Sequence, residues 1–325
     1  MPRIRPVALA TGERHVSHID IEAAVNVGYQ AAKATSGGQN ANYIPFLASV
    51  PSDLLGVAVV TTSGEVFKVG DADYQFAIES ISKVFTLALV MEAIGPVAVR
   101  EKIGADPTGL PFNSVIALEL HNGKPLSPLV NAGAIATASL VPGNDADAIW
   151  AAIKDAQSRF AGRTIALSPD VNSSEQATNF HNRAIAWLLY SAGACYSDPM
   201  QAVDVYTRQC STLVSTIDLA MMGATLASGG VNPVTGTRVI KAANVAPILA
   251  EMMMEGLYTA SGDWAYTVGL PGKSGVGGGI LAVVPGKLAI AAFSPPLDPV
   301  GNSVRGQVAV AKVAEQLGLN LFRPA

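Results

Sequence analysis

The chain has 325 residues, 50% hydrophobic and 14% charged, enough to bury a large core as one domain or two packed lobes. Its 21 Lys and Arg against 25 Asp and Glu give a net charge of −4 without a long basic run, which argues against nucleic-acid binding. No apolar run reaches the ~18 to 20 residues of a membrane span, and the apolar stretch near Met1 is too short for a signal peptide. We therefore expect a soluble, cytoplasmic protein without a membrane partner.

The first third of the chain predicts two helices and a hairpin. Residues 1–18 lack periodicity and are expected to form a loosely ordered tail. The elements that follow are a helix, two strands joined by a Gly turn, and an apolar helix: Ile19–Ala34, Leu55–Thr61, Glu65–Val69 and Ser80–Ile94.

Helical periodicity dominates the middle of the chain, and strand patterns return near its end. The expected helices are Val115–Leu118, Ala132–Leu140, Asp145–Arg159, Asn182–Ser191, Ala202–Gln209 and Ser215–Ala227. The later elements are a short strand, a helix, a second hairpin and a closing helix: Arg238–Ile240, Ala242–Met254, Gly279–Val284 with Leu288–Phe293, and Ser303–Leu317. We expect an α/β part made of residues 19–106 and 231–325, with residues 107–230 inserted as a helical subdomain.

Several cofactor motifs are incomplete. The third glycine of a dinucleotide fingerprint would fall at Ile280, and the first glycine of a phosphate-binding loop would fall at Thr267. Cys195 and Cys210 are too few for a disulfide framework and are expected to be buried thiols. The four histidines show no metal-ligand spacing: His15, His18, His121 and His181. The sequence therefore predicts neither a metal nor a nucleotide cofactor.

Ser80 and Lys83 form an S-x-x-K pair at the start of the apolar helix. Residues three apart lie on one helix face, so the amine can reach the hydroxyl. Lys83 can accept the Ser80 proton only when neutral, and burial favours the neutral form by lowering the pKa of the amine. The alternative is an N-capping serine beside a solvated lysine.

Lys273-Ser274-Gly275 precedes an apolar strand near the other end of the chain. A K-[ST]-G element is typical of serine hydrolases of the penicillin-recognising type, where this strand supplies a backbone N–H to the oxyanion. A β-bulge or tight turn is the alternative reason for its glycines. S-x-x-K early, K-S-G late and a helical insertion between them indicate a serine hydrolase.

The segment Phe76–Phe85 reads FAIESISKVF, and further blocks occur on both sides of it. They are Asn42–Pro45, Pro128–Ile135, Ser174-Glu175, Asn182–Ala186, Tyr206, Gln209-Cys210, Gly256–Tyr258, Val268–Gly279, Ser294-Pro295, Leu297-Asp298 and Gly301–Ser303. Together these blocks resemble the serine-dependent glutaminase family from about residue 40 to residue 317. The resemblance implies a β-lactamase-like fold of class α/β (α+β), with an antiparallel sheet flanked by helices and an inserted all-helical subdomain.

The resemblance also implies an amidohydrolase that converts L-glutamine into L-glutamate and ammonia without a cofactor, and a homo-oligomer, dimer or tetramer. Ser80 would attack the side-chain amide, Lys83 would accept its proton, and Tyr258 would assist proton transfer. The backbone N–H groups of Ser80 and Val276 would form the oxyanion hole. The residues that would hold the substrate are Tyr43, Ser80, Asn131, Glu175, Asn182, Tyr206, Tyr258 and Val276.

The chemistry of this set suits glutamine. Glu175 can pair with the α-ammonium, and amide or hydroxyl donors can bind the carboxylate and the carbonyl. Each residue also has a purely structural alternative. Asn131 and Asn182 could be helix N-caps, Glu175 a solvated loop carboxylate, and the tyrosines ordinary core or surface aromatics.

Four positions beside the site depart from the family pattern: Ser127, Asn179, His181 and Thr259. They bear on affinity more than on reaction type. Two other functions stay open, a β-lactam-acting acylase or transpeptidase and a non-catalytic amino-acid-binding protein with the same pocket. Selectivity for glutamine over asparagine is open as well, because one methylene changes binding by only ~1 to 3 kcal/mol.

Overall fold

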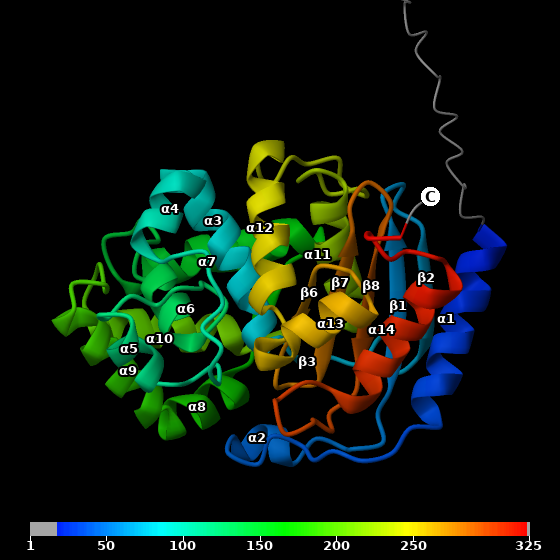
Figure 1. Ribbon diagram of the computed structural model, residues 1–325, viewed down its shortest axis with the longest axis horizontal. Helices are drawn as coiled ribbons and strands as arrows, with labels where there is room; N and C mark the ends of the chain where they lie inside the picture. Colours follow the sequence, from blue (N-terminus) through cyan, green and yellow to red (C-terminus); the bar gives the residue numbers. More distant parts are fainter. Residues whose placement is uncertain (1–17, 324–325) are drawn as a thin grey trace, which may run out of the picture.

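The computed structural model describes residues 18–323 (Figure 1). The tail expected over residues 1–18 lies outside this range, except that helix α1 (His18–Lys33) already begins at His18. Among the described residues no single helix is long and apolar enough to cross a membrane. Helices α3 (Ser82–Ile94) and α4 (Pro96–Lys102) reach the length and hydrophobicity of a membrane-spanning helix only when they are taken together. The chain bends by 113° between them, and most residues of α3 are buried inside the protein.

A five-stranded antiparallel sheet forms the centre of one part of the molecule, in the order β2-β1-β8-β7-β6. The strands are β1 (Gly56–Thr61), β2 (Val66–Gly70), β6 (Gly272–Ser274), β7 (Gly279–Val284) and β8 (Leu288–Phe293). Both predicted hairpins are confirmed. They join through β1 and β8, where Gly56 lies opposite Phe293, so the two ends of the chain share one sheet (Figure 1).

Both faces of this sheet are covered by helices. Alternate residues such as Val57 and Ile290 pack with α1 and α14 (Val304–Gln316), whereas Ala58 and Ala291 face the core that contains α11 (Thr216–Ala227). Because neither face meets water, β1, β7 and β8 are buried along their whole length and read as continuous apolar runs.

Helix α11 lies inside the segment that the sequence assigns to the helical part, yet it packs directly on β1, β7 and β8. Gly223 allows this close approach. A Cβ at that position would come within 2.5 Å of Leu281 Cδ1 and 2.7 Å of the Ala289 Cβ.

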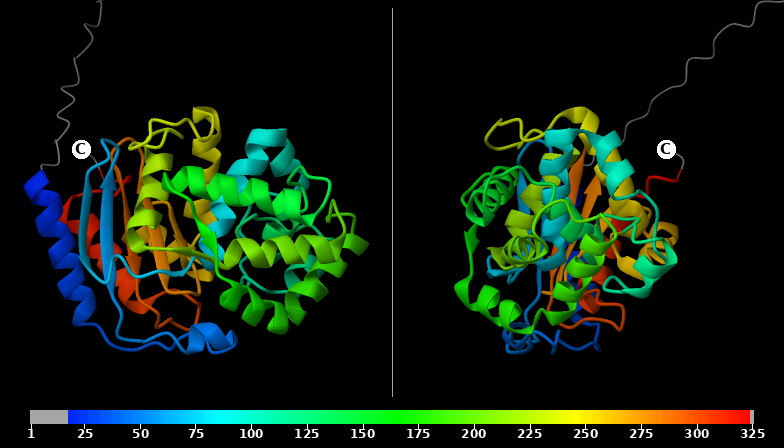
Figure 2. Two further views of the ribbon diagram at one scale, coloured as in Figure 1. Left: turned by 180° about the vertical axis from the view of Figure 1, so that it is seen from behind. Right: turned by 90° about the vertical axis from the view of Figure 1, so that its left-hand side faces the viewer.

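The remaining helices gather beside the sheet (Figure 2). This group consists of α5 (Ile116–Leu120), α6 (Asn131–Ala138), α7 (Ala146–Ala161), α8 (Pro169–Thr178), α9 (Phe180–Ser191) and α10 (Pro199–Cys210). Three further helices come from earlier or later segments of the chain: α2 (Pro45–Ala48), α12 (Ala242–Glu255) and α13 (Ser261–Thr267). Helix α3 packs against α6, α7 and α12 and so lies between the two parts. The buried thiols Cys195 and Cys210 are both free, as predicted.

Some elements differ from the prediction. Helix α8 was missed because its sequence, PDVNSSEQAT, is polar and buries only Val171 and Glu175. A second sheet was missed as well, with the order β3-β5-β4. Its strands, of two or three residues each, are β3 (Phe76–Ala77), β4 (Ala166–Leu167) and β5 (Thr212–Val214). The strand expected at Arg238–Ile240 is reduced to one bridge between Val231 and Arg238.

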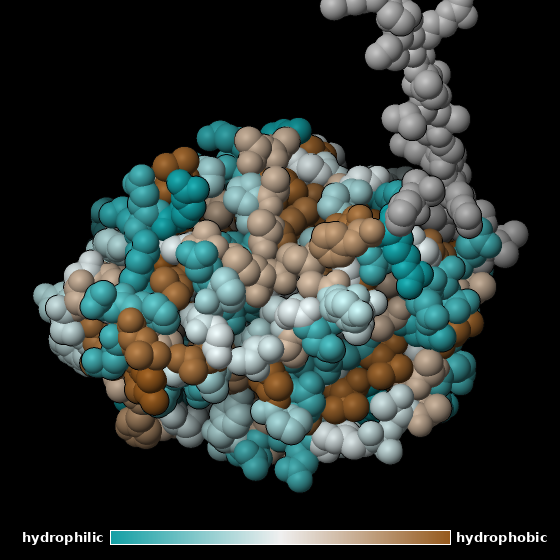
Figure 3. Space-filling view, in the orientation of Figure 1, coloured by the Kyte–Doolittle hydropathy of each residue, from teal (hydrophilic) through white to brown (hydrophobic). Residues whose placement is uncertain are grey.

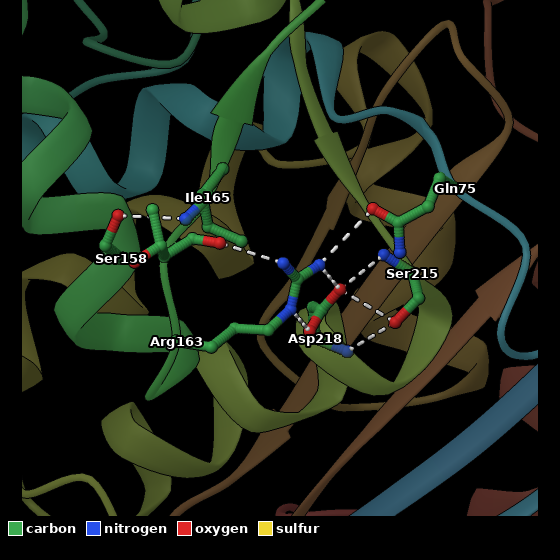
Figure 4. Close-up of polar contacts among 7 residues, drawn as sticks. Gln75, Ser158, Arg163, Ile165, Ser215 and Asp218 are labelled. Atoms are coloured by element: carbon green, nitrogen blue, oxygen red, sulfur yellow. Dashed lines mark hydrogen bonds and ion pairs between the residues drawn. The ribbon is translucent and has the colours of Figure 1, made fainter.

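The start of α11 is fixed by a capping box and an ion pair (Figure 4). Ser215 Oγ accepts the Asp218 backbone N–H at 3.1 Å, and the Asp218 carboxylate accepts the Ser215 backbone N–H at 2.7 Å. Arg163, from the turn between α7 and β4, pairs with the same carboxylate. The Asp218 carboxylate therefore connects the start of α11 to the turn that carries Arg163, 55 residues away in the sequence.

Candidate active site

The serine of the S-x-x-K pair lies in a short 3₁₀ turn, η1 (Glu79–Ile81), that continues into α3. The prediction that the α-helix itself begins at Ser80 is therefore two residues early. Glu79 has a positive φ of 50°, a conformation that non-glycine residues rarely adopt. The β6–β7 loop presses on this turn: a Cβ at Gly275 would lie 2.8 Å from the Ile78 carbonyl, and one at Gly277 2.3 Å from that of Ala77.

Lys83 is buried and points at Ser80. Its Nζ lies 2.9 Å from Ser80 Oγ and 2.8 Å from Asn131 Oδ1, and its side chain is 1% exposed. Burial lowers the pKa of Lys83 to about 8, against the opposing charges around it. No carboxylate among residues 18–323 forms an ion pair with this amine. The alternative of a solvated lysine is therefore wrong.

Asn131 connects the lysine to two further predicted site residues. Its Oδ1 also accepts the Tyr206 hydroxyl at 3.1 Å, and its Nδ2 donates to Asn182 Oδ1 at 3.0 Å. Asn131 is the first residue of α6, whose N-cap is Val130, and Asn182 lies inside α9. The N-cap alternatives for both asparagines are therefore wrong.

Tyr258 is almost fully buried and has a positive φ of 57°. Its hydroxyl donates to the Ser274 carbonyl at 3.4 Å and lies near Ser80. Burial raises the pKa of Tyr258, so the phenol is neutral and can donate. The Lys273 amine lies over the face of the Tyr258 ring, with Nζ 4.2 Å from the ring centroid.

Lys273 is also fully buried, and its Nζ donates to the carbonyls of Gly256 at 2.9 Å and Ser274 at 2.7 Å. Burial and the nearby Lys83 hold the pKa of Lys273 well below its usual value. The sequence motif identified this lysine but not its position beneath Tyr258.

Glu175 lies on α8 and is 7% exposed, so the alternative of a solvated loop carboxylate is wrong. Its Oε1 accepts the Ser211 hydroxyl at 3.1 Å. Near it lies the carboxyl group of Glu79, which is also buried. Glu79 is not among the site residues predicted from the sequence, although its place directly before Ser80 is a signal that could have identified it.

Tyr43 and Val276 complete the predicted set at its edge. Tyr43 is 54% exposed and lines a cavity of about 620 Å³ together with Phe112 and Gly301. The Phe112 ring packs against the Tyr258 ring at a tilt of 37°, with the centroids 4.6 Å apart, so the cavity adjoins the buried residues. Val276 lies in the β6–β7 loop and packs in a small cluster with Ile44 and Leu297.

Three of the four positions that depart from the family pattern form hydrogen bonds within the protein. Ser127 Oγ accepts the Leu129 N–H at 3.1 Å, Asn179 donates to Thr207 Oγ1 at 3.0 Å, and His181 Nε2 lies 2.6 Å from the Asn113 carbonyl oxygen. Thr259 is exposed within the turn η2 (Tyr258–Ala260). Their effect on affinity stays a prediction.

The sequence of this chain is similar to that of known glutaminases. A model of the glutaminase family matches residues 38–322. The chain belongs to the glutaminase family. It is 76% identical over 302 residues to a glutaminase of Brucella canis, covering 93% of this chain and 95% of the relative. It is 68% identical over 303 residues to glutaminase 1 of Escherichia coli O157:H7, covering 93% and 98%.

Among solved structures, a probable glutaminase superposes with a TM-score of 0.94 at 66% identity, over 95% of this chain and 100% of that one. The predicted family, the β-lactamase-like fold and the assignment as a glutaminase are confirmed by these matches.

Proposed function

We propose that this chain hydrolyses the side-chain amide of L-glutamine to L-glutamate and ammonia, with Ser80 as nucleophile and Lys83 as general base. The proposal rests mainly on the buried amine of Lys83, which lies 2.9 Å from Ser80 Oγ. This amine forms no ion pair with a carboxylate within residues 18–323. A neutral amine in that position can take the hydroxyl proton as the serine attacks.

The reaction has two steps. Ser80 Oγ attacks the amide carbon while its proton passes to Lys83, and the amide nitrogen leaves as ammonia after taking up that proton. Water then attacks the acyl-enzyme ester and passes a proton to Lys83, which returns that proton to Ser80 Oγ as the ester bond breaks and glutamate leaves. The backbone N–H groups of Ser80 and Val276 are the proposed donors to the oxyanion. Tyr258, whose neutral phenol lies near Ser80, is the proposed partner in proton transfer.

The substrate is held through its charged end. Glu175 is the proposed acceptor for the α-ammonium, because a buried carboxylate forms a strong charge-assisted contact. The amides of Asn131 and Asn182 and the hydroxyl of Tyr206 are proposed to bind the carboxylate and the carbonyl. Tyr43, at the rim of the cavity, is proposed to close over the bound molecule.

An ammonia-release assay on glutamine and asparagine side by side tests the function, with Ser80→Ala as control. We expect release from glutamine and none from the Ser80→Ala protein, which should still bind glutamate. A chromogenic β-lactam in parallel tests the first rival; turnover there without ammonia from glutamine would reverse the assignment. Glutamine binding without turnover by the wild type would instead support a non-catalytic binding protein.

We also propose a cytoplasmic homo-oligomer. Apolar side chains gather over the α5 and α9 end of the molecule (Figure 3). The exposed ones on these helices are Ile116, Leu120, Phe180, Trp187 and Tyr190. An exposed apolar patch of this kind favours contact with another copy. Light scattering on the wild type and on a Leu120→Glu variant tests it: a mass unchanged by the substitution would argue against this surface.

A further inference from the structure

The carboxyl groups of Glu79 and Glu175 form a buried pair next to the nucleophile. Glu79 is 3% exposed and Glu175 is 7% exposed, and the two carboxyl groups lie close enough for each to shift the pKa of the other. Two ionised carboxylates at close range repel strongly in a site from which water is largely excluded. A proton on one of them removes this repulsion and allows that carboxyl group to donate a hydrogen bond to the other. The pair therefore carries one shared proton.

The surroundings place that proton on Glu79. Glu175 Oε1 has a hydroxyl donor, Ser211, whereas Oε1 of Glu79 has no donor in the described part of the chain. A carboxylate is favoured where donors reach it, and a neutral carboxyl where none does. Burial, followed by the charge of Glu175, raises the pKa of Glu79 well above its ordinary value. Burial raises the pKa of Glu175 as well, to about 7, but there the Ser211 hydroxyl acts against burial and favours the ionised form.

The other titratable groups around Glu79 agree with a neutral carboxyl. They are Lys83 on α3, Cys210 on α10, Tyr258 on η2, and Tyr43 in the loop before α2. Burial raises the pKa of the Cys210 thiol and of the Tyr258 phenol, and the half-exposed Tyr43 phenol is neutral at neutral pH as tyrosines ordinarily are. Lys83 alone can become a cation, and its charge lowers the pKa of Glu79 by less than burial and Glu175 raise it.

We propose that Glu79 is a positioning residue, whose protonated carboxyl donates a hydrogen bond to Glu175 and fixes that carboxylate as the acceptor for the substrate's ammonium group. This inference rests on the proposed function, because it assigns Glu175 the ammonium. It also gives a reason for the positive φ of 50° at Glu79: this backbone conformation is rare for a non-glycine residue and accompanies a side chain held between the nucleophile and α8.

Two substitutions separate hydrogen bonding from size. Glutamine has the same length as glutamic acid, and its amide N–H can donate to Glu175 as the protonated carboxyl does. Methionine fills a similar volume without a donor. Glu79→Gln should therefore keep KM for glutamine within about threefold, and Glu79→Met should raise it about tenfold or more, because a hydrogen bond to a charged group is lost.

A substrate analogue shows whether the effect acts through the ammonium. The half-amide of glutaric acid is glutamine without its α-amino group, so it has no ammonium for Glu175 to bind. The loss in kcat/KM caused by Glu79→Met should be about tenfold larger for glutamine than for the half-amide. An equal loss for both compounds would overturn the proposal, since it would mean general damage to the site.

The proton itself can be measured without any turnover. At neutral pH the difference infrared spectrum, wild type minus Glu79→Gln, should contain the carbonyl stretch of one protonated carboxyl group. Glu251→Gln is the matched control: burial raises the pKa of Glu251 to about 8, so it should remove a similar band at a position outside the site. A carboxylate band in place of the protonated band at Glu79 would overturn the proposal.

These measurements distinguish the failure of this inference from failure of the proposed function. If the wild type released no ammonia from glutamine, the function would be wrong while the infrared result at Glu79 still stood. If ammonia were released and Glu79→Gln raised KM as much as Glu79→Met, the function would stand and the positioning role would be wrong.

Discussion

The burial of Lys83 should determine the pH range in which the enzyme is active. Burial lowers the pKa of its amine to about 8 and outweighs the neighbouring acidic groups Cys210, Glu79 and Glu175, which act in the opposite direction. A depressed pKa of this kind is what a lysine base requires near neutral pH, because the protonated amine cannot accept the Ser80 proton.

We expect kcat/KM to rise about tenfold per pH unit on the acid side and to level off above pH ~8, because only the neutral amine is active. Initial rates of ammonia release between pH ~6 and pH ~9 measure this directly. Lys83→Ala should lose at least ~10²-fold in rate and show no such limb. A flat wild-type profile would remove Lys83 from the role of base.

At the scale of single elements, Asp218 joins the N-terminus of α11 to the turn that carries Arg163. Partial burial opposes ionisation, but hydrogen bonds from Arg163 and Ser215 outweigh it and hold the pKa of Asp218 below its usual value. A depressed carboxyl pKa contributes stability above the unfolded pKa, and that stability is lost as the pH falls through the folded value.

Asp218→Asn should therefore lower the free energy of unfolding by about 1 to 2 kcal/mol at neutral pH. The difference from wild type should shrink in acid, where the wild-type carboxyl is protonated. Urea titrations at several pH values measure it. Asp147→Asn is the control: its carboxylate is 87% exposed, so its pair with Arg208 should contribute about 0 to 1 kcal/mol. Equal effects of the two substitutions would contradict the role given to Asp218.

For the whole molecule, the largest apolar core crosses from the sheet into the helices. It contains Ala58 and Phe293 from the sheet together with Ile149 and Ile185 from the helical part. The Gly223 contact adds α11 to the sheet at close range. Because these residues belong to one continuous apolar cluster, the two parts should unfold as one unit.

Tryptophan fluorescence tests that expectation. Trp264 lies in the core beneath α1 and α14, whereas Trp150 and Trp187 lie in helices α7 and α9. Trp264→Phe and the double variant Trp150→Phe/Trp187→Phe each report on one part. We expect each variant's fluorescence and far-UV circular dichroism to change at one common urea midpoint. Separate midpoints within a single variant would show that the parts unfold independently.

The sequence alone determined the two hairpins β1–β2 and β7–β8 and most helices, because buried strands leave apolar runs and amphipathic helices keep a visible period. It also predicted that Ser80 and Lys83 lie together, since a spacing of three residues places two side chains on one helical face. The order of the motifs indicated a serine hydrolase, and the resemblance of the blocks from about residue 40 to residue 317 indicated the family.

Only the tertiary structure decided the environment of these side chains. Whether Lys83 is charged, whether Asn131 caps a helix and whether Glu175 is solvated depend on residues brought together from distant parts of the chain. The segment around Glu175 is polar, so neither its helix nor its burial could be read locally. Glu79 shows the limit most clearly: a glutamate is ordinarily ionised, and only contact with a second carboxyl group in a dry site gives it a proton.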